Sequence, residues 1–248
     1  MSITISKFDD QSRGYSDGGK IKERKGVYFE SEVKGVSNLF YWAYVWSDEG
    51  GTVEEHAHKG FEIITYVLDG ELEQKNSDSE AWEKLGKGDM QVMRSGNGFS
   101  HSEKFNPGAK VLQIWMDPDF RRSLQRPAAY TDYEASDFEK ESFNGMDRID
   151  FCGDESPVWF ASPLQMDRFD FGKGSYNIPV PKDHIFTAVV IGGEVTVNGE
   201  AMSEGDLVRL ESEEEFGFET AGDGSLFSVV VPTEPGYRTY TDQLQMSS

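Results

Sequence analysis

The sequence predicts an all-β protein built from two β-barrels in tandem. Aromatic residues make up 13% of the 248 residues and glycine occurs 26 times, which is typical of chains with many short strands and turns. Uninterrupted helical patterns are scarce. An ordered series of strand and turn patterns also occurs twice, about half a chain apart, and this indicates an internal duplication.

The first barrel is expected over residues 1–118. Its opening residues read as strands with turns, and a dense aromatic strand follows at 39–46. Further strands are expected where apolar or alternating runs are bounded by turn residues, at 61–68, 71–74, 90–93 and 111–115. Turns are predicted at Asp48-Glu49-Gly50-Gly51, Asp69-Gly70 and Gly88-Asp89.

The same order of patterns returns in the second half of the chain. Residues 186–195 repeat the pattern of 63–72, and Gly205-Asp206 repeats Gly88-Asp89. We therefore expect a second barrel over residues 158–248. Between the barrels, 119–157 is rich in Pro, Arg and acidic residues, and we expect a linker region that is partly packed.

Three of the four histidines lie in two short units of the first copy. The units are His56-Ala57-His58 and His101-Ser102-Glu103, and each places two ligand-type side chains at i and i+2. On a strand this spacing puts both groups on one face. Three imidazoles and a carboxylate are a usual ligand set for a divalent first-row metal. The sequence therefore predicts a mononuclear metal site on His56, His58, His101 and Glu103.

The second copy provides an internal comparison. Carried across the duplication, the four predicted ligands fall on residues that bind no metal, Pro179, Pro181, Phe218 and Thr220. The second barrel is therefore expected to lack the site. The remaining histidine, His184, has no partner nearby in sequence, and we expect a surface or packing role for it.

Charge and cysteine content restrict the classes of partner and compartment. The net charge of −21 disfavours direct binding to nucleic acid or to an anionic membrane, since both need Lys and Arg. Cys152 is the only cysteine, so no disulfide can form within the chain, and we expect it to pack as a small residue. No apolar run is long enough to span a membrane, and the N-terminus has no signal-peptide pattern. We expect a cytoplasmic protein.

The motifs around the histidines resemble those of the cupin superfamily and, in the details of their sequence, those of the pirin family. The matching segments are His56-Ala57-His58-Lys59-Gly60-Phe61-Glu62, Thr65-Tyr66-Val67-Leu68-Asp69-Gly70-Glu71, Gly88-Asp89-Met90-Gln91-Val92-Met93, Ser95-Gly96-Asn97-Gly98-Phe99-Ser100-His101-Ser102-Glu103 and Leu112-Gln113-Ile114-Trp115. The resemblance implies a bicupin, two cupin-type barrels, whose N-terminal barrel holds one metal and whose C-terminal barrel holds none.

The resemblance also bears on the acidic ligand and on the metal. In the wider cupin pattern the carboxylate after His-x-His is the ligand, here Glu62, whereas in pirin-like proteins it is the one after the last histidine, here Glu103. We favour Glu103, and Glu62 stays a second-shell partner or a substitute ligand. Fe(II) is the metal we expect first, with Ni, Cu, Mn, Co or Zn as alternatives, since an N₃O site accepts all of them.

By its resemblance to bacterial pirin-like quercetinases, the chain is expected to be a dioxygenase that cleaves flavonol-type aromatic substrates with O₂. Glu103 or Glu62 would accept the substrate's proton. Phe99, Phe61, Met93 and Trp115 are candidates to line a flat pocket, and each could equally belong to the core.

Two other functions stay open at this point. The first is a metal-holding regulatory protein that binds a protein partner, as animal pirins are described to do, and the acidic surface would suit a basic partner. The second is a barrel that binds a small sugar or acid without redox chemistry, which rests on fold analogy alone.

Overall fold

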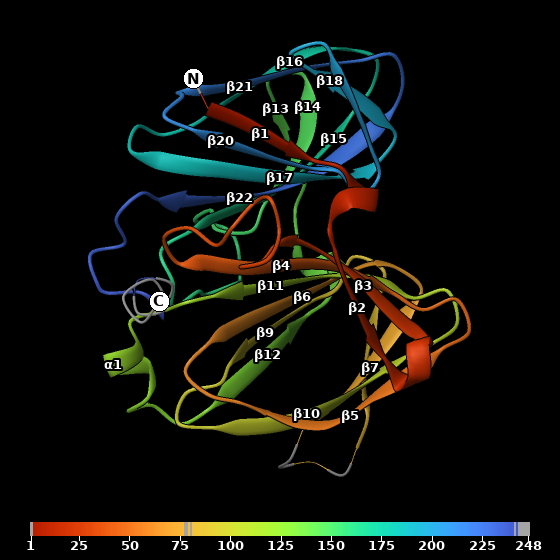
Figure 1. The fold of residues 1–248 in the computed structure, drawn as a ribbon, viewed down its shortest axis with the longest axis vertical. Helices are drawn as coiled ribbons and strands as arrows, with labels where there is room; N and C mark the ends of the chain where they lie inside the picture. The colour runs from red at the N-terminus through yellow and green to blue at the C-terminus, as the bar shows by residue number, and fades with distance from the viewer. Residues whose placement is uncertain (1, 77–78, 80, 241, 243–248) are drawn as a thin grey trace. The chain divides into compact units, whose positions relative to one another are not determined.

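A computed structural model describes residues 2–76, 79, 81–240 and 242. Almost all of its regular elements are strands, and two similar groups of strands follow each other along the chain (Figure 1). Among the described residues, no helix is long and apolar enough to cross a membrane. This arrangement confirms the predicted all-β fold class.

The strands of the first half follow the predicted turns closely. Their bounds are β1 Ser2–Ser6, β2 Ser12–Ser16, β3 Ile21–Val27, β4 Leu39–Trp46, β5 Gly51–His58, β6 Glu62–Asp69, β7 Glu71–Asn76, β8 Glu83–Gly86, β9 Met90–Arg94, β10 Phe99–Phe105, β11 Lys110–Met116 and β12 Ala129–Tyr133. Short helical turns also occur, η1 Phe8–Asp10, η2 Asp17–Gly19, α1 Phe120–Ser123 and η3 Ala135–Asp137.

The second half repeats this series. Its strands are β13 Glu141–Phe143, β14 Met146–Asp150, β15 Gln165–Phe171, β16 Gly174–Pro179, β17 His184–Gly192, β18 Glu194–Val197, β19 Glu200–Ser203, β20 Leu207–Glu211, β21 Glu215–Thr220 and β22 Gly224–Pro232. The run predicted at 186–195 lies in β17 and β18.

Each group of strands forms one seven-stranded and one four-stranded sheet. The N-terminal group has the orders β12-β9-β6-β11-β4-β3-β2 and β5-β10-β7-β8. The C-terminal group has the orders β1-β20-β17-β22-β15-β14-β13 and β16-β21-β18-β19. The two pairs of sheets correspond strand for strand, so the duplication inferred from sequence holds for the fold.

The first strand does not belong to the half of the chain in which it lies. β1 pairs antiparallel with β20, and in Figure 1 it is the red strand beside the blue β20. In the same way, β12 precedes the C-terminal group in sequence but pairs with β9 of the N-terminal group. The chain divides accordingly into an N-terminal unit, residues 12–135 with 160–162 and the described residues after 235, and a C-terminal unit, residues 2–11, 136–159 and 163–235.

This division differs from the predicted boundaries at 118 and 158. Residues 2–11 were expected in the first barrel, and they pack in the C-terminal unit. The expected linker, 119–157, contains strands of both units: β12 belongs to the N-terminal unit, and β13 and β14 belong to the C-terminal unit. The reason is that edge strands pair with whichever sheet edge the tertiary fold presents, which a local sequence pattern does not record.

Two aspartates anchor β1 and β12, which we call the exchanged strands, by equivalent hydrogen bonds. Asp89 accepts from the backbone N–H of Gly86 at 2.7 Å and of Ala135, after β12, at 2.8 Å. Asp206 accepts from the N–H of Ser203 at 2.9 Å and of Phe8, after β1, at 2.8 Å. The Gly-Asp motif that marks the duplication in sequence is thus the point where each unit receives its exchanged strand.

The interior between the two sheets differs in the two units. In the C-terminal unit it is filled by aliphatic side chains and a row of aromatic rings, with Phe186 stacked on Phe216 at 4.7 Å and Phe216 on Phe218 at 5.8 Å between ring centroids. In the N-terminal unit an apolar cluster fills one end of the interior, and it includes Val67, Leu72 and Phe105. The other end contains the histidines.

Candidate metal centre

The histidines lie on two neighbouring strands of the four-stranded sheet. β10 pairs with β5 so that His101 stands opposite His56, and Phe99 stands opposite His58. Between His101 and Glu103 the register shifts, because β5 carries one extra residue there. The bulge keeps Val53 and His56 on the inner face of the sheet. The predicted i, i+2 placement of the ligands on strands is therefore observed.

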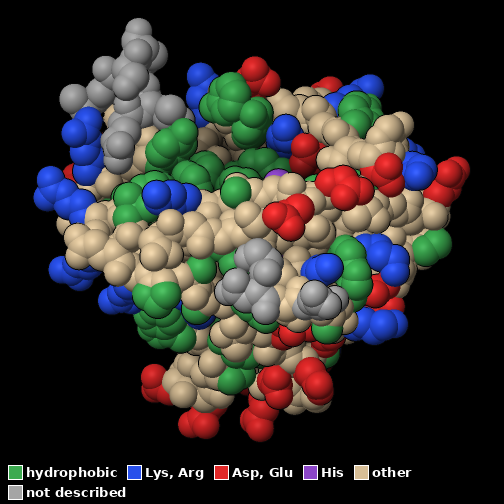
Figure 2. Space-filling model, turned by 90° about the horizontal axis from the view of Figure 1, so that it is seen from below, with side chains coloured by type: hydrophobic (Ala, Val, Ile, Leu, Met, Phe, Trp, Pro, Cys, Tyr) green, Lys and Arg blue, Asp and Glu red, His purple; other side chains and the backbone are tan. Residues whose placement is uncertain are grey.

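The three imidazoles meet in the interior of the N-terminal unit. One ring nitrogen from each of His56, His58 and His101 lies within 4.8 Å of the others, a group that could hold a metal ion. His101 is 2% exposed and His58 9% exposed, while His56 is half-buried. On the face of the molecule in Figure 2, histidine colour shows inside a hollow bordered by hydrophobic side chains.

Hydrogen bonds fix the tautomers of two of these rings. His56 Nδ1 lies 2.9 Å from the carbonyl oxygen of Glu54, which can only accept, so Nδ1 carries the hydrogen. His101 Nδ1 lies 3.0 Å from Gln74 Oε1 and donates to it in the same way. Both Nε2 atoms therefore present lone pairs, and they lie 3.1 Å apart.

Two lone pairs at this distance repel each other unless a cation lies between them. Metal–nitrogen bonds of about 2.1 Å at right angles would place two ligand nitrogens about 3 Å apart, close to the observed separation. The residues present thus fit a divalent transition metal. The hydrogen bonds on Nδ1 are the usual outer-shell support of metal-binding histidines.

Burial keeps the imidazoles in the form that binds metals. It lowers the pKa of His58 to about 4, with a smaller contribution from His56. It lowers the pKa of His101 to about 3, with His56 and His58 adding to the effect. Both rings are therefore neutral at pH 7, with no proton to displace when a metal binds.

Glu103 lies beside the three histidines and is held by two amides. Its Oε1 accepts from Gln74 Nε2 at 2.9 Å and from Gln113 Nε2 at 2.8 Å, and the residue is 4% exposed. Burial raises the pKa of this carboxyl, and the bonds from Gln74, the proximity of His56 and the bond from Gln113 oppose that rise. Glu103 is not among the residues whose ligand atoms all lie within 4.8 Å of one another.

Gln74 was not predicted as a site residue, although it orients two of them. Its Oε1 accepts from His101 and its Nε2 donates to Glu103. The signal in the sequence was the alternation of residues 71–74, which places Gln74 on the inner face of β7. A buried amide on that face needs polar partners, and the histidine and the carboxylate provide them.

Glu62, the alternative to Glu103 as ligand or base, lies away from the histidines, and its carboxylate has other partners. Ile63 packs in the interior with Met93, so Glu62, its neighbour on β6, faces the other side of the sheet. There it is fully buried, and its carboxylate accepts from the N–H groups of Ala161 at 2.7 Å and Ser162 at 2.9 Å. Strict alternation from His58 would place Glu62 on the same face, but Gly60, with φ +88°, turns the chain between β5 and β6.

A cavity of about 150 Å³ adjoins His56 and Glu103. Of the four residues expected to line a pocket, only Trp115 lines this one. Phe61, Met93 and Phe99 belong to a separate apolar cluster, although Phe99 lies 5.9 Å from the His101 ring. The other residues of the wall are Ser16, Ile21, Lys22, Glu23, Tyr41, Val45, Val53, Phe105 and Gln113.

Comparisons with known proteins point to one family. The family model described as Pirin matches residues 28–116. The chain is 24% identical to mouse Pirin over 82% of this chain and 76% of the mouse protein. It is 28% identical to a Zymomonas mobilis protein whose name assigns it provisionally to the quercetin 2,3-dioxygenases, over 91% of this chain and 97% of the other.

A solved structure shows the same fold. A bacterial pirin from Escherichia coli in complex with nickel(II) superimposes with a TM-score of 0.77 at 21% identity, covering 93% of this chain and 99% of the other. These matches confirm the resemblance found in the motifs: residues 28–116 match the Pirin family model, and most of the chain is similar to proteins named pirin.

Proposed function

We propose that this protein is a metal-dependent dioxygenase of the quercetin 2,3-dioxygenase kind, acting on a hydroxylated aromatic substrate with O₂. The observation that carries the proposal is the pair of Nε2 lone pairs held 3.1 Å apart beside a buried carboxylate and a cavity. The similarity to the Zymomonas protein supports the class of reaction.

In this proposal His56, His58 and His101 hold the metal, and Glu103 is the fourth ligand on the side of the cavity. A metal bound there acidifies a substrate hydroxyl and supplies the redox chemistry with O₂. Fe(II) is the first metal to test.

Glu103 has a second role. The carboxylate lines the cavity and can accept the proton of the substrate hydroxyl. Gln74 and Gln113 hold it in place for both roles.

The test combines metal analysis with oxygen uptake. Protein purified without oxygen and supplied with Fe(II) is expected to bind about one equivalent and to consume O₂ with a hydroxylated aromatic, for which quercetin and a one-ring diphenol are offered in turn. His101→Ala should lose most of the metal and the uptake, because only three of the four ligands, His56, His58 and Glu103, remain to hold the ion. His184→Ala is the matched control, since His184 lies on β17 outside the group of three histidines, and it should keep both.

Two outcomes would contradict the proposal. Turnover in metal-free His101→Ala protein would exclude a metal-dependent reaction. One bound metal in the wild type without oxygen uptake, whatever hydroxylated aromatic is offered, would favour the regulatory alternative and a search for protein partners.

A further inference from the structure

The cavity beside the metal centre is also lined by two polar side chains that bond to each other, Tyr41 and Glu23. The hydroxyl of Tyr41 on β4 donates to Glu23 Oε2 on β3 at 2.6 Å. Both residues line the cavity together with His56 and Glu103. The ligand set and the proposed mechanism leave this pair without a role.

A glycine on the neighbouring strand, Gly14, leaves the space that the Glu23 carboxylate occupies. Glu23 stands opposite Gly14 in the β2–β3 ladder, and a Cβ at Gly14 would fall 1.7 Å from Glu23 Oε1. The carboxylate therefore occupies the volume that any other residue at position 14 would fill. Lys25 Nζ lies 3.2 Å from the same Oε1, so the two oxygens of Glu23 have different partners.

The distance between Tyr41 and Glu23 is that of a hydrogen bond to an ionised carboxylate. With the phenol donating, its oxygen keeps a lone pair that can accept from another hydroxyl. Tyr41 is itself 9% exposed and packs on Trp115 at 5.1 Å, and Trp115 contacts the His58 ring at 4.8 Å. Trp115 thus forms a wall that runs from the metal centre to this pair.

The size of the cavity limits what can enter it. An engineered apolar cavity of about 150 Å³ in another protein holds one benzene ring, whereas pockets for drug-sized ligands span about 300–1,000 Å³. The cavity here has a volume of about 150 Å³ and is walled by Trp115, Phe105 and Val53. It suits a single aromatic ring, while a flavonol has three.

We infer that this cavity binds a single aromatic ring with two hydroxyls, catechol being the simplest, and that Tyr41 and Glu23 bind the hydroxyl that faces away from the metal. The inference rests on the proposed function and narrows its substrate from flavonols to one-ring diphenols. A site whose buried polar groups hydrogen-bond a substrate hydroxyl discriminates strongly against analogues without it. Tyr41 and Glu23 are therefore specificity-determining residues.

The experiment measures binding, separately from turnover. Protein loaded with Zn(II), which does no redox chemistry, is titrated with catechol, phenol and quercetin by calorimetry. We expect catechol to bind at least tenfold more tightly than either of the other two. Glu23→Gln should weaken catechol binding about tenfold or more, since hydrogen bonds to charged groups contribute at least that much, and Tyr41→Phe, which removes a neutral hydrogen bond, should weaken it about threefold or more.

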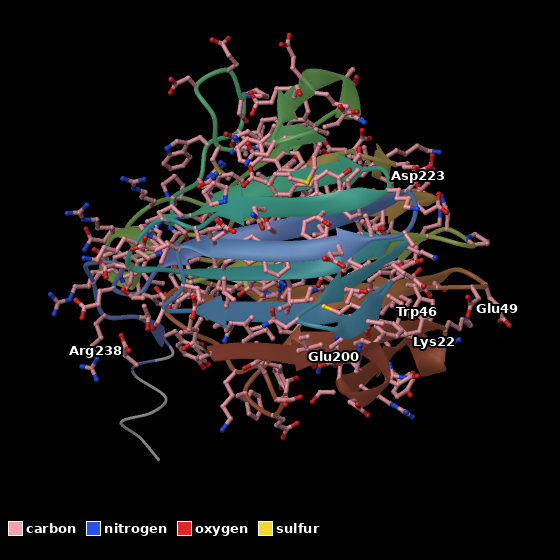
Figure 3. The ribbon with its side chains drawn as sticks, turned by 90° about the horizontal axis from the view of Figure 1, so that it is seen from above. Lys22, Trp46, Glu49, Glu200, Asp223 and Arg238 are labelled. Atoms are coloured by element: carbon pink, nitrogen blue, oxygen red, sulfur yellow. The ribbon has the colours of Figure 1, made fainter. Side chains whose placement is uncertain are left out.

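Matched controls separate these effects from a general disturbance. Tyr15→Phe makes the same chemical change on a tyrosine of β2 that is 61% exposed, and Glu49→Gln does so on a glutamate that extends away from the protein in Figure 3. Both should leave catechol binding unchanged. Gly14→Ala leaves Tyr41 and Glu23 intact but displaces the carboxylate, and it should weaken catechol binding as Glu23→Gln does. Zinc content is measured for every variant.

Each other result would overturn the inference. Quercetin binding as tightly as catechol would show that the cavity admits a larger ligand, while leaving the dioxygenase proposal intact. Catechol binding that is unchanged in Tyr41→Phe and Glu23→Gln would remove the role of the pair. If catechol does not bind to the zinc-loaded protein, the inference is wrong, and oxygen uptake with quercetin decides the proposed function independently.

Discussion

At the scale of single residues, Asp117 shows how burial shapes the pH response of this protein. It is fully buried, its Oδ2 accepts from the backbone N–H of Tyr240, and its carbonyl oxygen accepts from the Tyr237 hydroxyl at 2.7 Å. Burial raises the pKa of this carboxyl to about 7, against a hydrogen bond from Tyr240 that lowers it. The folded state therefore keeps a proton that the unfolded chain releases near pH 4.

This raised pKa predicts that stability falls as the pH rises. Between pH 4 and 7 the folded state binds more protons at Asp117 than the unfolded state, so the free energy of unfolding should fall by up to about 1.4 kcal/mol per pH unit from this group. Asp117→Asn removes this contribution, so the free energy of unfolding of the variant should increase relative to that of the wild type as the pH rises from 5 to 7. Urea denaturation at three pH values tests this, with the exposed Asp223→Asn as control. Parallel pH profiles for wild type and Asp117→Asn would refute it.

At the scale of elements, glycines with positive φ close the hairpins of both units. Gly193, with φ +73°, lies between β17 and β18, and a Cβ there would fall 2.3 Å from the carbonyl oxygen of Asp223. Gly70, with φ +71°, occupies the equivalent turn, and its Cβ would fall 2.8 Å from Ala109 Cα. These turns need glycine for two reasons. The backbone adopts a positive φ, and the loop before β22 or β11 lies too close to leave room for a Cβ.

A comparison of two alanine variants separates these two requirements. Gly199, with φ +82°, turns the hairpin between β18 and β19, and a Cβ there meets nothing within 4 Å. Gly199→Ala should therefore cost only the conformational penalty, about 1–2 kcal/mol. Gly193→Ala should cost roughly 1–3 kcal/mol more, because its Cβ overlaps backbone that must move. Equal losses in chemical denaturation would show that the close approach has no energetic weight.

Local patterns predicted the strands and turns well, and failed where the outcome depended on distant parts of the chain. The i, i+2 spacing of the histidines and the turn at Asp69-Gly70 are properties of a few neighbouring residues, and the structure bears both out. The side chain of Glu62 was misplaced because a single turn at Gly60 resets the alternation. Gln74 was missed because its two partners come from β10, which lies about 30 residues later in sequence.

At the scale of the whole molecule, β1 and β12 are exchanged between the units. β1 precedes the N-terminal strands in sequence but pairs in the C-terminal unit, and β12 precedes the C-terminal strands but pairs in the N-terminal unit. Besides the β1–β20 ladder, Gln11 Nε2 donates to the carbonyl oxygen of Gly205 at 2.9 Å, and Lys7 contacts Asp206 at 3.2 Å. The contacts that stabilise residues 2–11 are thus made with the C-terminal unit. The metal centre draws none of its histidines from them.

Removal of residues 2–11 should therefore affect the unit that lies far from the cut in sequence. The amides of β20 that pair with β1 would become an exposed sheet edge, and hydrogen exchange in Leu207–Glu211 should accelerate at least tenfold. Zinc binding by the truncated protein should stay near one equivalent. Unchanged protection in β20, or loss of zinc with β20 intact, would contradict the assignment of these residues to the C-terminal unit.

The exchange also sets an order of events during synthesis. Ile5 pairs with Val208, so at about 5–20 residues per second β1 leaves the ribosome roughly 10–40 s before its partner exists. Thr131 pairs with Val92 and meets a strand that has already been made. The nascent chain thus carries β1 unpaired while the N-terminal sheets assemble, and residues 2–6 stay open during that time to chaperones that bind extended segments.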